Sequence, residues 1–202
     1  IRRSGKSVML ELIKEELAEA GVAPSQMISI NFEDMRYSHL QTATALHDEI
    51  IKRAEGIEGK AYLFFDEIQE VEGWEKCVNS LRVALDCDIY ITGSNAKLLS
   101  GELATYIGGR YVEFVIYPFS FAEFLELYHT IAPSDSIQQC FQKYLLAGGM
   151  PYLANLRYEE EPSRQYLTDL FNSVQLKDIV KRNKIRDIDL LERIIAYMTA
   201  NV

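Results

Sequence analysis

The sequence Tyr62-Leu-Phe-Phe-Asp-Glu67 runs from four apolar residues straight into two acids. A short, continuous apolar run of this kind is typical of a strand that is buried on both faces of a parallel sheet. In α/β folds, ligands bind at the carboxyl ends of such strands, which is where Asp66 and Glu67 would stand. The stretch therefore predicts a parallel sheet with an acidic site at its carboxyl edge.

The segments on either side of this stretch alternate between helical and strand-like patterns. That order predicts an α/β fold in which helices flank a parallel sheet. In the first helix, Val8, Leu12, Ile13 and Leu17 are expected to share the buried face. Helices are expected at residues 7–20, 44–54 and 74–85, and strands at 27–32, 61–65, 89–92 and 111–117.

Beyond Pro118 the patterns are helical only, and we interpret them as a small helical lid. The sequence Ser120-Phe-Ala-Glu123 predicts a capping box, in which each side chain satisfies the other residue's backbone N–H. The Gly-Gly-Met-Pro run at 148–151 must interrupt any helix. Further helices are expected at residues 136–147, 163–181 and 187–200.

Ser4-Gly-Lys-Ser7, at the start of the first predicted helix, matches the second half of a phosphate-binding loop, Gly-x4-Gly-Lys-Ser/Thr. The first Gly of that loop would stand one place before Ile1, so we expect the chain to begin inside the loop. Gly5 would let backbone N–H groups wrap phosphate, Lys6 would reach the β and γ oxygens, and Ser7 would hold Mg²⁺. Alone, the tripeptide equally fits an ordinary helix start.

The two acids, about 60 residues farther on, supply the second motif that this loop needs. In a Walker B pattern, Asp66 would contact Mg²⁺ or its bound water, and Glu67 would polarise the attacking water. The alternative is that the acids only solvate a strand end, but the Gly-Lys-Ser sequence upstream favours the functional interpretation. The expected nucleotide-binding residues are Arg3, Ser4, Gly5, Lys6, Ser7 and Val8, and the expected Mg²⁺ ligands are Ser7 and Asp66.

Two further regions are candidates for contact with the γ-phosphate. Ser94 and Asn95 follow the strand expected at 89–92, and either could sense the phosphate; the alternative is a routine turn with a helix cap. Arg110 follows Gly108-Gly109 and could act as an arginine finger on a neighbouring subunit's nucleotide, or it could be a surface arginine. Neither pair of alternatives is resolved by the residues alone.

Composition excludes several classes of function. The net charge of −9 over 202 residues gives no broad basic footprint for nucleic acid. The three cysteines form no Cys-x-x-Cys pair, which argues against a disulfide framework and a zinc site and favours a reducing, cytoplasmic location. The apolar runs are far shorter than the roughly 20 residues that cross a bilayer, so no membrane association is expected.

Several short sequences along the chain together point to one family: Arg2–Ser7, Phe65–Val71 with Gly73-Trp74-Glu75, Ile91–Asn95, Gly109-Arg110, Tyr117–Phe124 and Gly148–Pro151. In these residues the chain resembles a family of prokaryotic AAA-like ATPases in which this core precedes a C-terminal domain. The resemblance implies ATP and Mg²⁺ as cofactors, ATP hydrolysis, and a C-terminal domain similar to a winged helix followed by a nuclease-like fold, with Asp187–Val202 as its first helix.

The expected organisation is a P-loop ATPase core at residues 1–128, a helical lid at 129–160, and helices at 161–202 that lead into a further domain. The leading hypothesis is a switch or motor in which hydrolysis moves the lid and an effector domain. It would act as a homo-oligomer, with a protein or DNA partner bound through the C-terminal domain. The alternatives are a non-hydrolysing, nucleotide-gated scaffold and a small-molecule kinase. Without the first loop Gly, this piece is expected to bind ATP poorly.

Overall fold

The computed structural model describes residues 3–93, 108–174 and 187–201. The chain divides into two compact units, one holding Arg3–Tyr117 and the other beginning at Pro118. We call them the sheet unit and the helical unit. Among the described residues, no helix is both long enough and apolar enough to cross a membrane.

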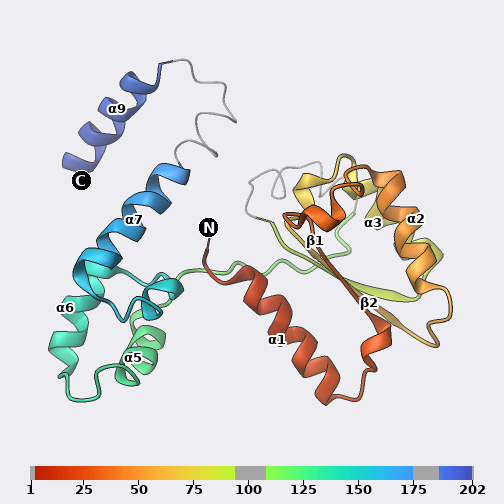
Figure 1. Cartoon of the computed structure of the whole chain (residues 1–202), viewed down its shortest axis with the longest axis horizontal. Helices are drawn as coiled ribbons and strands as arrows, with labels where there is room; N and C mark the ends of the chain where they lie inside the picture. Colours follow the sequence, from red (N-terminus) through yellow and green to blue (C-terminus); the bar gives the residue numbers. More distant parts are fainter. Residues whose placement is uncertain (1–2, 94–107, 175–186, 202) are drawn as a thin grey trace. The chain divides into compact units, whose positions relative to one another are not determined.

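The described part of the sheet unit contains a parallel sheet in the order β1-β2-β3, as the alternating sequence pattern predicted (Figure 1). The register sets Asn31 opposite Asp66, and Phe65 opposite Ile91. All carboxyl ends therefore lie at one edge of the sheet. The strands are β1 (Met27–Asn31), β2 (Ala61–Asp66) and β3 (Cys87–Ile91).

One face of the sheet is covered by α2 (Ala43–Ala54) and α3 (Trp74–Ala84). Alternate strand residues such as Ile30, Leu63 and Phe65 point into this layer, because neighbouring strand side chains point to opposite faces. The helices meet them with residues at 3.6-residue spacing. The fully buried helical residues of this layer are Leu46, Ile50 and Leu81.

The opposite face is covered by α1 (Lys6–Glu19), which contacts β2. Lys14 packs its stem there, with its ammonium 5.7 Å from the centre of the Phe64 ring. The buried face of α1 centres on Leu10, while Val8 and Leu12 are 60% and 50% exposed. The prediction that Val8 and Leu12 face the core was therefore wrong, because the helix turns its 10, 13, 14 and 17 positions to the sheet.

Residues 111–117 do not form the strand that the sequence predicted. Tyr111, Val112, Phe114, Val115 and Tyr117 are 44 to 81% exposed, and no strand of the described residues pairs with this segment. A β-like pattern reports side chains that suit a sheet, whereas a strand also needs a neighbour for its backbone N–H and C=O groups. The sequence pattern alone does not show whether a neighbouring strand is present to pair with this segment.

The helical unit contains α5 (Phe121–His129), α6 (Ile137–Ala147), α7 (Glu160–Val174) and α9 (Ile188–Ala200). The capping box is confirmed: the Ser120 N–H donates to Glu123 Oε2 at 2.7 Å, and the Glu123 N–H donates to Ser120 Oγ at 3.4 Å. The helix predicted at 163–181 corresponds to α7, which begins three residues earlier than predicted. The predicted end of this helix lies outside the described residues.

Aromatic rings form the core of the helical unit. Phe124 lies at its centre, with ring centroids 5.1 Å from Tyr128, 5.2 Å from Tyr144 and 5.0 Å from Tyr158. The contacts are stacked, tilted and edge-to-face in that order, and such pairs stabilise aromatic clusters beyond the area that they bury. Leu153, on the 3-10 helix η5 (Pro151–Ala154), closes the cluster.

The structure shows why the second glycine of the Gly-Gly-Met-Pro sequence, Gly149, must be a glycine. Its carbonyl accepts a hydrogen bond from the Phe119 N–H at 2.7 Å, and a Cβ added to Gly149 would come within 2.0 Å of the Phe119 carbonyl oxygen. Only glycine allows the two backbones to approach so closely. The segment before α5 and the end of α6 are thereby joined.

The two compact units divide between Tyr117 and Pro118, earlier than the predicted boundary after residue 128. The reason is that α5 packs into the aromatic core together with α6 and η5. The functional division into ATPase core, lid and lead-in helices stays a prediction.

Candidate functional site

The Asp66 carboxylate lies at the carboxyl end of β2 and is only 6% exposed. Asn31 Nδ2 donates to its Oδ2 at 3.0 Å, and Thr92 Oγ1 donates to its Oδ1 in a short contact. Asn31 is the last residue of β1 and Thr92 directly follows β3, so the register of the sheet brings both beside the acid. Each carboxylate oxygen keeps a second lone pair for another donor or a cation.

Glu67 turns the chain sharply after β2, with φ at 55° in the left-handed region. That conformation is strained for a residue with a side chain, and the surroundings must maintain it. Thr92 does so: its hydroxyl accepts from the Glu67 N–H at 3.3 Å, and its carbonyl accepts from the Ile68 N–H at 3.2 Å. Thr92 therefore ties the backbone of one acid to the carboxylate of the other.

The start of α1 has the features of an anion-binding helix end. Gly5 occupies the N-cap with φ at 101°, it has no side chain to cap the first N–H groups, and the first turn holds no acidic residue. No described residue lies within 4 Å of a Cβ built on Gly5. The N–H groups of the first turn and the helix dipole together favour a phosphate there.

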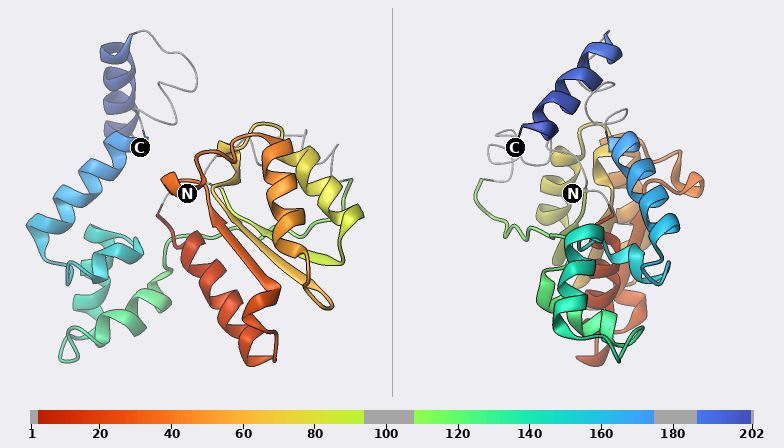
Figure 2. Two further views of the ribbon diagram at one scale, coloured as in Figure 1. Left: turned by 45° about the vertical axis from the view of Figure 1, so that its right-hand side comes forward. Right: turned by 90° about the vertical axis from the view of Figure 1, so that its left-hand side faces the viewer.

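The start of α1 and the acids share one edge of the sheet. α1 begins at the end of the sheet where β1 and β2 finish, which both views show (Figures 1 and 2). The Lys14 ammonium donates to Ser29 Oγ at 3.3 Å, which fixes this part of α1 beside the middle of β1. At the helical rise per residue, Lys6 lies roughly 12 Å from Lys14 along α1, toward the carboxyl edge of the sheet. At the strand rise per residue, Asp66 lies roughly 7 Å from Phe64 along β2, in the same direction.

These residues fit a nucleotide with its Mg²⁺. The predicted binding residues Arg3–Val8 form the N-terminal turn and its approach, where Ser4 is buried and Arg3 has φ at 57°. A run that mixes left-handed and right-handed backbone directs successive N–H groups to one point. Ser7 and Asp66 offer the hydroxyl and carboxylate oxygens that Mg²⁺ prefers beside phosphate.

Three other expectations concern Ser94 and Asn95, Arg110 and the cysteines. Ser94 and Asn95 lie outside the described residues. Arg110 is exposed, after a turn in which Gly108 and Gly109 have φ of 57° and 70°. Cys77 is buried in the core, and burial raises the pKa of its thiol to about 12, which suits a packing role. Within the described ranges, no group of three or more His, Cys, Asp or Glu could hold a metal ion by itself.

The roles of Asn31, Thr92 and Gln69 were not predicted from the sequence. Thr92 carried a usable signal, because it is the polar residue at which the strand expected at 89–92 ends, and Asn31 lies one position before the end of the strand expected at 27–32. Gln69 lies on the 3-10 helix η3 (Ile68–Glu70), and its Nε2 donates to Glu67 Oε2 in a short contact. Gln69 belongs to the Phe65–Val71 sequence that carries the family resemblance, but that sequence does not give its partner, since the turn after Glu67 decides where its side chain points.

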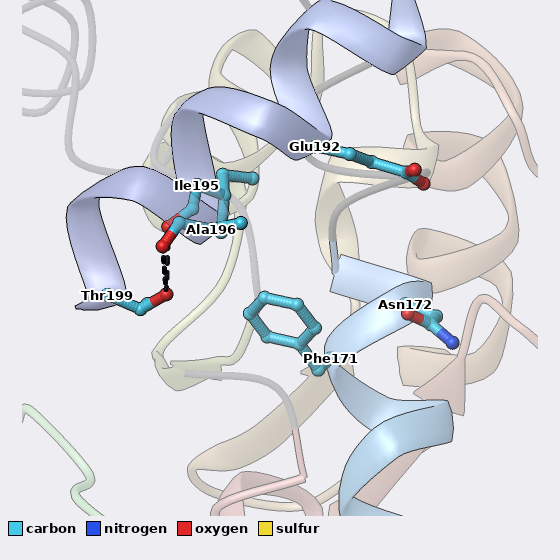
Figure 3. Close-up of a pocket in the computed structure, with 6 residues that line it drawn as sticks. All are labelled: Phe171, Asn172, Glu192, Ile195, Ala196 and Thr199. Carbon is cyan, nitrogen blue, oxygen red and sulfur yellow. Dashed lines mark hydrogen bonds between the residues drawn. The ribbon is translucent and has the colours of Figure 1, made fainter.

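A shallow hollow of about 340 Å³ lies elsewhere, between α7 and α9 of the helical unit (Figure 3). Phe171 and Asn172 line it from α7, and Glu192, Ile195, Ala196 and Thr199 line it from α9. None of the predicted site residues is among them, and the Thr199 hydroxyl is already bonded to the Ile195 carbonyl at 2.9 Å. The residues that line the hollow therefore give no reason to connect it with the candidate site at the sheet edge.

Comparison with known proteins gives the family. Residues 1–125 match the model of a family described as an AAA domain, and residues 138–202 match a domain of unknown function (DUF8612). The chain therefore belongs to the AAA domain family, whose name indicates a nucleotide-binding domain. That agrees with an α/β sheet that has the start of a helix and two acids at one edge.

Two relatives resemble the whole chain. An uncharacterized protein of Haemophilus influenzae is 40% identical over 203 residues, which cover 100% of this chain and 50% of that protein. Uncharacterized protein MJ1544 of Methanocaldococcus jannaschii is 32% identical over 213 residues, 100% of this chain and 46% of that protein. The chain thus spans about half the length of the curated relatives that it matches. No solved structure matches it significantly.

Proposed function

We propose that this chain is an ATP-binding and Mg²⁺-dependent ATP-hydrolysing domain that acts as a switch or motor for an attached effector domain. The observation that carries the proposal is the placement of Asp66 and Glu67 at the same sheet edge as the start of α1. Membership of the AAA domain family supports it.

Binding falls to the start of α1. The N–H groups that follow Gly5 would surround the β-phosphate, and the Lys6 ammonium would neutralise the β and γ oxygens. Ser7 and Asp66 would hold Mg²⁺, which supplies positive charge to the transferring phosphoryl group. Because Asn31 and Thr92 each donate to the Asp66 carboxylate, that group is held in one orientation before nucleotide arrives.

Hydrolysis needs a group that orients water, and Glu67 takes that role in the proposal. A carboxylate next to the Mg²⁺ site can accept a proton from the water that attacks the γ-phosphorus. Thr92 fixes the backbone of Glu67, so the side chain projects from a constrained point. Ser94 or Asn95 would sense the γ-phosphate, and Arg110 would act across an interface in a homo-oligomer.

Motion would pass to the helical unit, which takes the place of the lid in this proposal. Its aromatic core and its tie between Phe119 and Gly149 would let it move as one body. A protein or DNA partner would be engaged by residues beyond the described helices.

The test compares two variants of the natural full-length protein. Glu67→Gln should keep ATP affinity but lower turnover about a hundredfold, because only the water-orienting group is lost. Lys6→Ala should instead weaken ATP binding, because its charge faces the phosphates in the ground state. Lys52→Ala, an exposed lysine on α2, is the matched control and should change neither quantity.

The outcomes separate the functional classes. ATP binding that depends on Lys6, with no turnover in the parent protein, would establish the alternative of a nucleotide-gated scaffold. Normal turnover in Glu67→Gln would remove Glu67 from the mechanism. For Arg110, mixed oligomers of Arg110→Ala and Lys6→Ala subunits should regain some activity if the arginine acts in trans. Absence of rescue in demonstrably mixed oligomers would exclude that role.

A further inference from the structure

The side chain of Gln69 is directed at Glu67 by a rigid turn. Gln69 lies between Ile68 and Val71, which are both buried in the sheet unit's core. Backbone hydrogen bonds close the turn, from the Val71 N–H to the Ile68 carbonyl at 3.0 Å and from the Glu70 N–H to the Glu67 carbonyl at 3.2 Å. The position of Gln69 is therefore set by core packing and not by its own side-chain contacts.

The amide of Gln69 is oriented by the Glu67 carboxylate. Gln69 Nε2 donates to Glu67 Oε2, whereas Gln69 Oε1 is buried and accepts no hydrogen bond from the described residues. Buried polar atoms without a partner are rare and destabilising, so another interaction must favour this orientation. Rotating the amide by half a turn would place its oxygen against the carboxylate, two acceptors together. The bond to Glu67 thus outweighs the unpaired oxygen.

We propose that Gln69 is a positioning residue for Glu67 in the reaction proposed above, on which this inference rests. A free glutamate samples several rotamers, and its terminal torsion is broad. The Gln69 donor restricts the Glu67 carboxylate to one of these rotamers, so that the carboxylate is already oriented toward the attacking water. Gln69 itself touches neither nucleotide nor water in this account.

The experiment measures kcat and KM for ATP in the natural full-length protein. Gln69→Met keeps the length of the side chain but removes the donor, and kcat should fall about tenfold with KM unchanged. Gln69→Glu replaces the donor with a second carboxylate and should lower kcat at least as much. The matched control is Gln26→Met, because Gln26 Nε2 donates to the Lys60 carbonyl at 3.0 Å at the opposite edge of the sheet. It should keep the parental kcat.

A second background separates positioning from a structural role. With Glu67→Gln already present, adding Gln69→Met should leave kcat nearly unchanged, because the donor acts only through the lost carboxylate. An equal tenfold loss in both backgrounds would show a general structural defect and overturn the proposal.

The two proposals fail in distinguishable ways. If Glu67→Gln slows turnover but Gln69→Met and Gln69→Glu both keep the parental kcat, the Gln69 inference alone is wrong. If Glu67→Gln leaves turnover unchanged, Glu67 is not the water-orienting group and both proposals are wrong. Thermal unfolding of Gln69→Met should match the parent protein, since the substitution also removes the unpaired buried oxygen.

Discussion

The sheet unit gathers its buried polar side chains at one edge, whereas the helical unit spreads single tyrosine hydroxyls around an aromatic core. At the sheet edge, Asn31 and Thr92 both donate to Asp66. In the helical unit, Tyr128 donates to Asp135 Oδ2 at 3.0 Å and Tyr144 donates to the Phe119 carbonyl at 2.9 Å, each at a separate place. The first arrangement concentrates charge and donors at one place, and the second distributes them around the packed core.

The difference shows how secondary structure places polar groups. Parallel strands end at one edge, so their terminal side chains converge without help from sequence proximity. Packed helices present polar atoms wherever a long side chain reaches the surface of the core. We therefore expect substitutions in the two units to separate effects on stability from effects on chemistry.

The largest effect should come from the α2 side of the sheet. Leu46→Ala removes a side chain with 0% exposure and should lower the free energy of unfolding by about 3 kcal/mol. The matched change Leu12→Ala on α1, at 50% exposure, should cost less than about 1 kcal/mol. Denaturant unfolding measures both. Equal losses would mean that the outer face of α1 is covered in solution.

In the helical unit, Gly149→Ala should lower the free energy of unfolding by about 2 kcal/mol, because the new Cβ would overlap the Phe119 carbonyl and force the two backbones apart. Gly148→Ala tests backbone strain alone: its Cβ meets nothing within 4 Å, but its φ of 72° with ψ of −172° is a conformation that essentially only glycine adopts. It should cost about 1 to 2 kcal/mol. A Gly149→Ala variant as stable as the parent protein would refute the close approach.

At the sheet edge, Thr92→Val should affect turnover more than stability. It removes the hydroxyl that donates to Asp66 and accepts from the Glu67 N–H. We expect kcat for ATP to fall about tenfold, which corresponds to about 1.4 kcal/mol. Thr92→Ser keeps the hydroxyl and should retain most activity. Equal kinetics in Thr92→Val and the parent would show that the tie is dispensable for catalysis.

The smallest effect should come from the capping box of α5. Ser120→Ala removes the cap and should cost about 1 kcal/mol at neutral pH. The hydrogen bonds from Ser120 hold the pKa of Glu123 below its usual value. That contribution is present above the unfolded pKa of Glu123 and is lost as the pH falls through the folded one. The difference in the free energy of unfolding between Ser120→Ala and the parent protein should therefore become smaller at acid pH. A difference that does not change with pH would contradict a contribution from the Ser120–Glu123 capping box.

The position of the two acids could be read from the sequence because it depends on local order. An apolar run that ends in Asp66 and Glu67 predicts a strand, and parallel strands expose their carboxyl ends to ligands. The start of α1 and the Ser120 cap were predictable for the same reason, since caps and turns involve residues a few positions apart. The structure confirms these elements within a residue or two.

The partners of those acids depended on the tertiary structure. Thr92 lies 26 positions from Asp66 and Asn31 lies 35, so strand register decides the contacts and no local pattern reports them. The exposed segment 111–117 shows the same limit, because its composition suits a strand but pairing needs a neighbouring backbone. The sequence by itself determined which residues are candidates for the proposed chemistry. Only the tertiary structure decided which of these residues contact one another, because contacts between residues far apart in the sequence depend on how whole helices and strands pack.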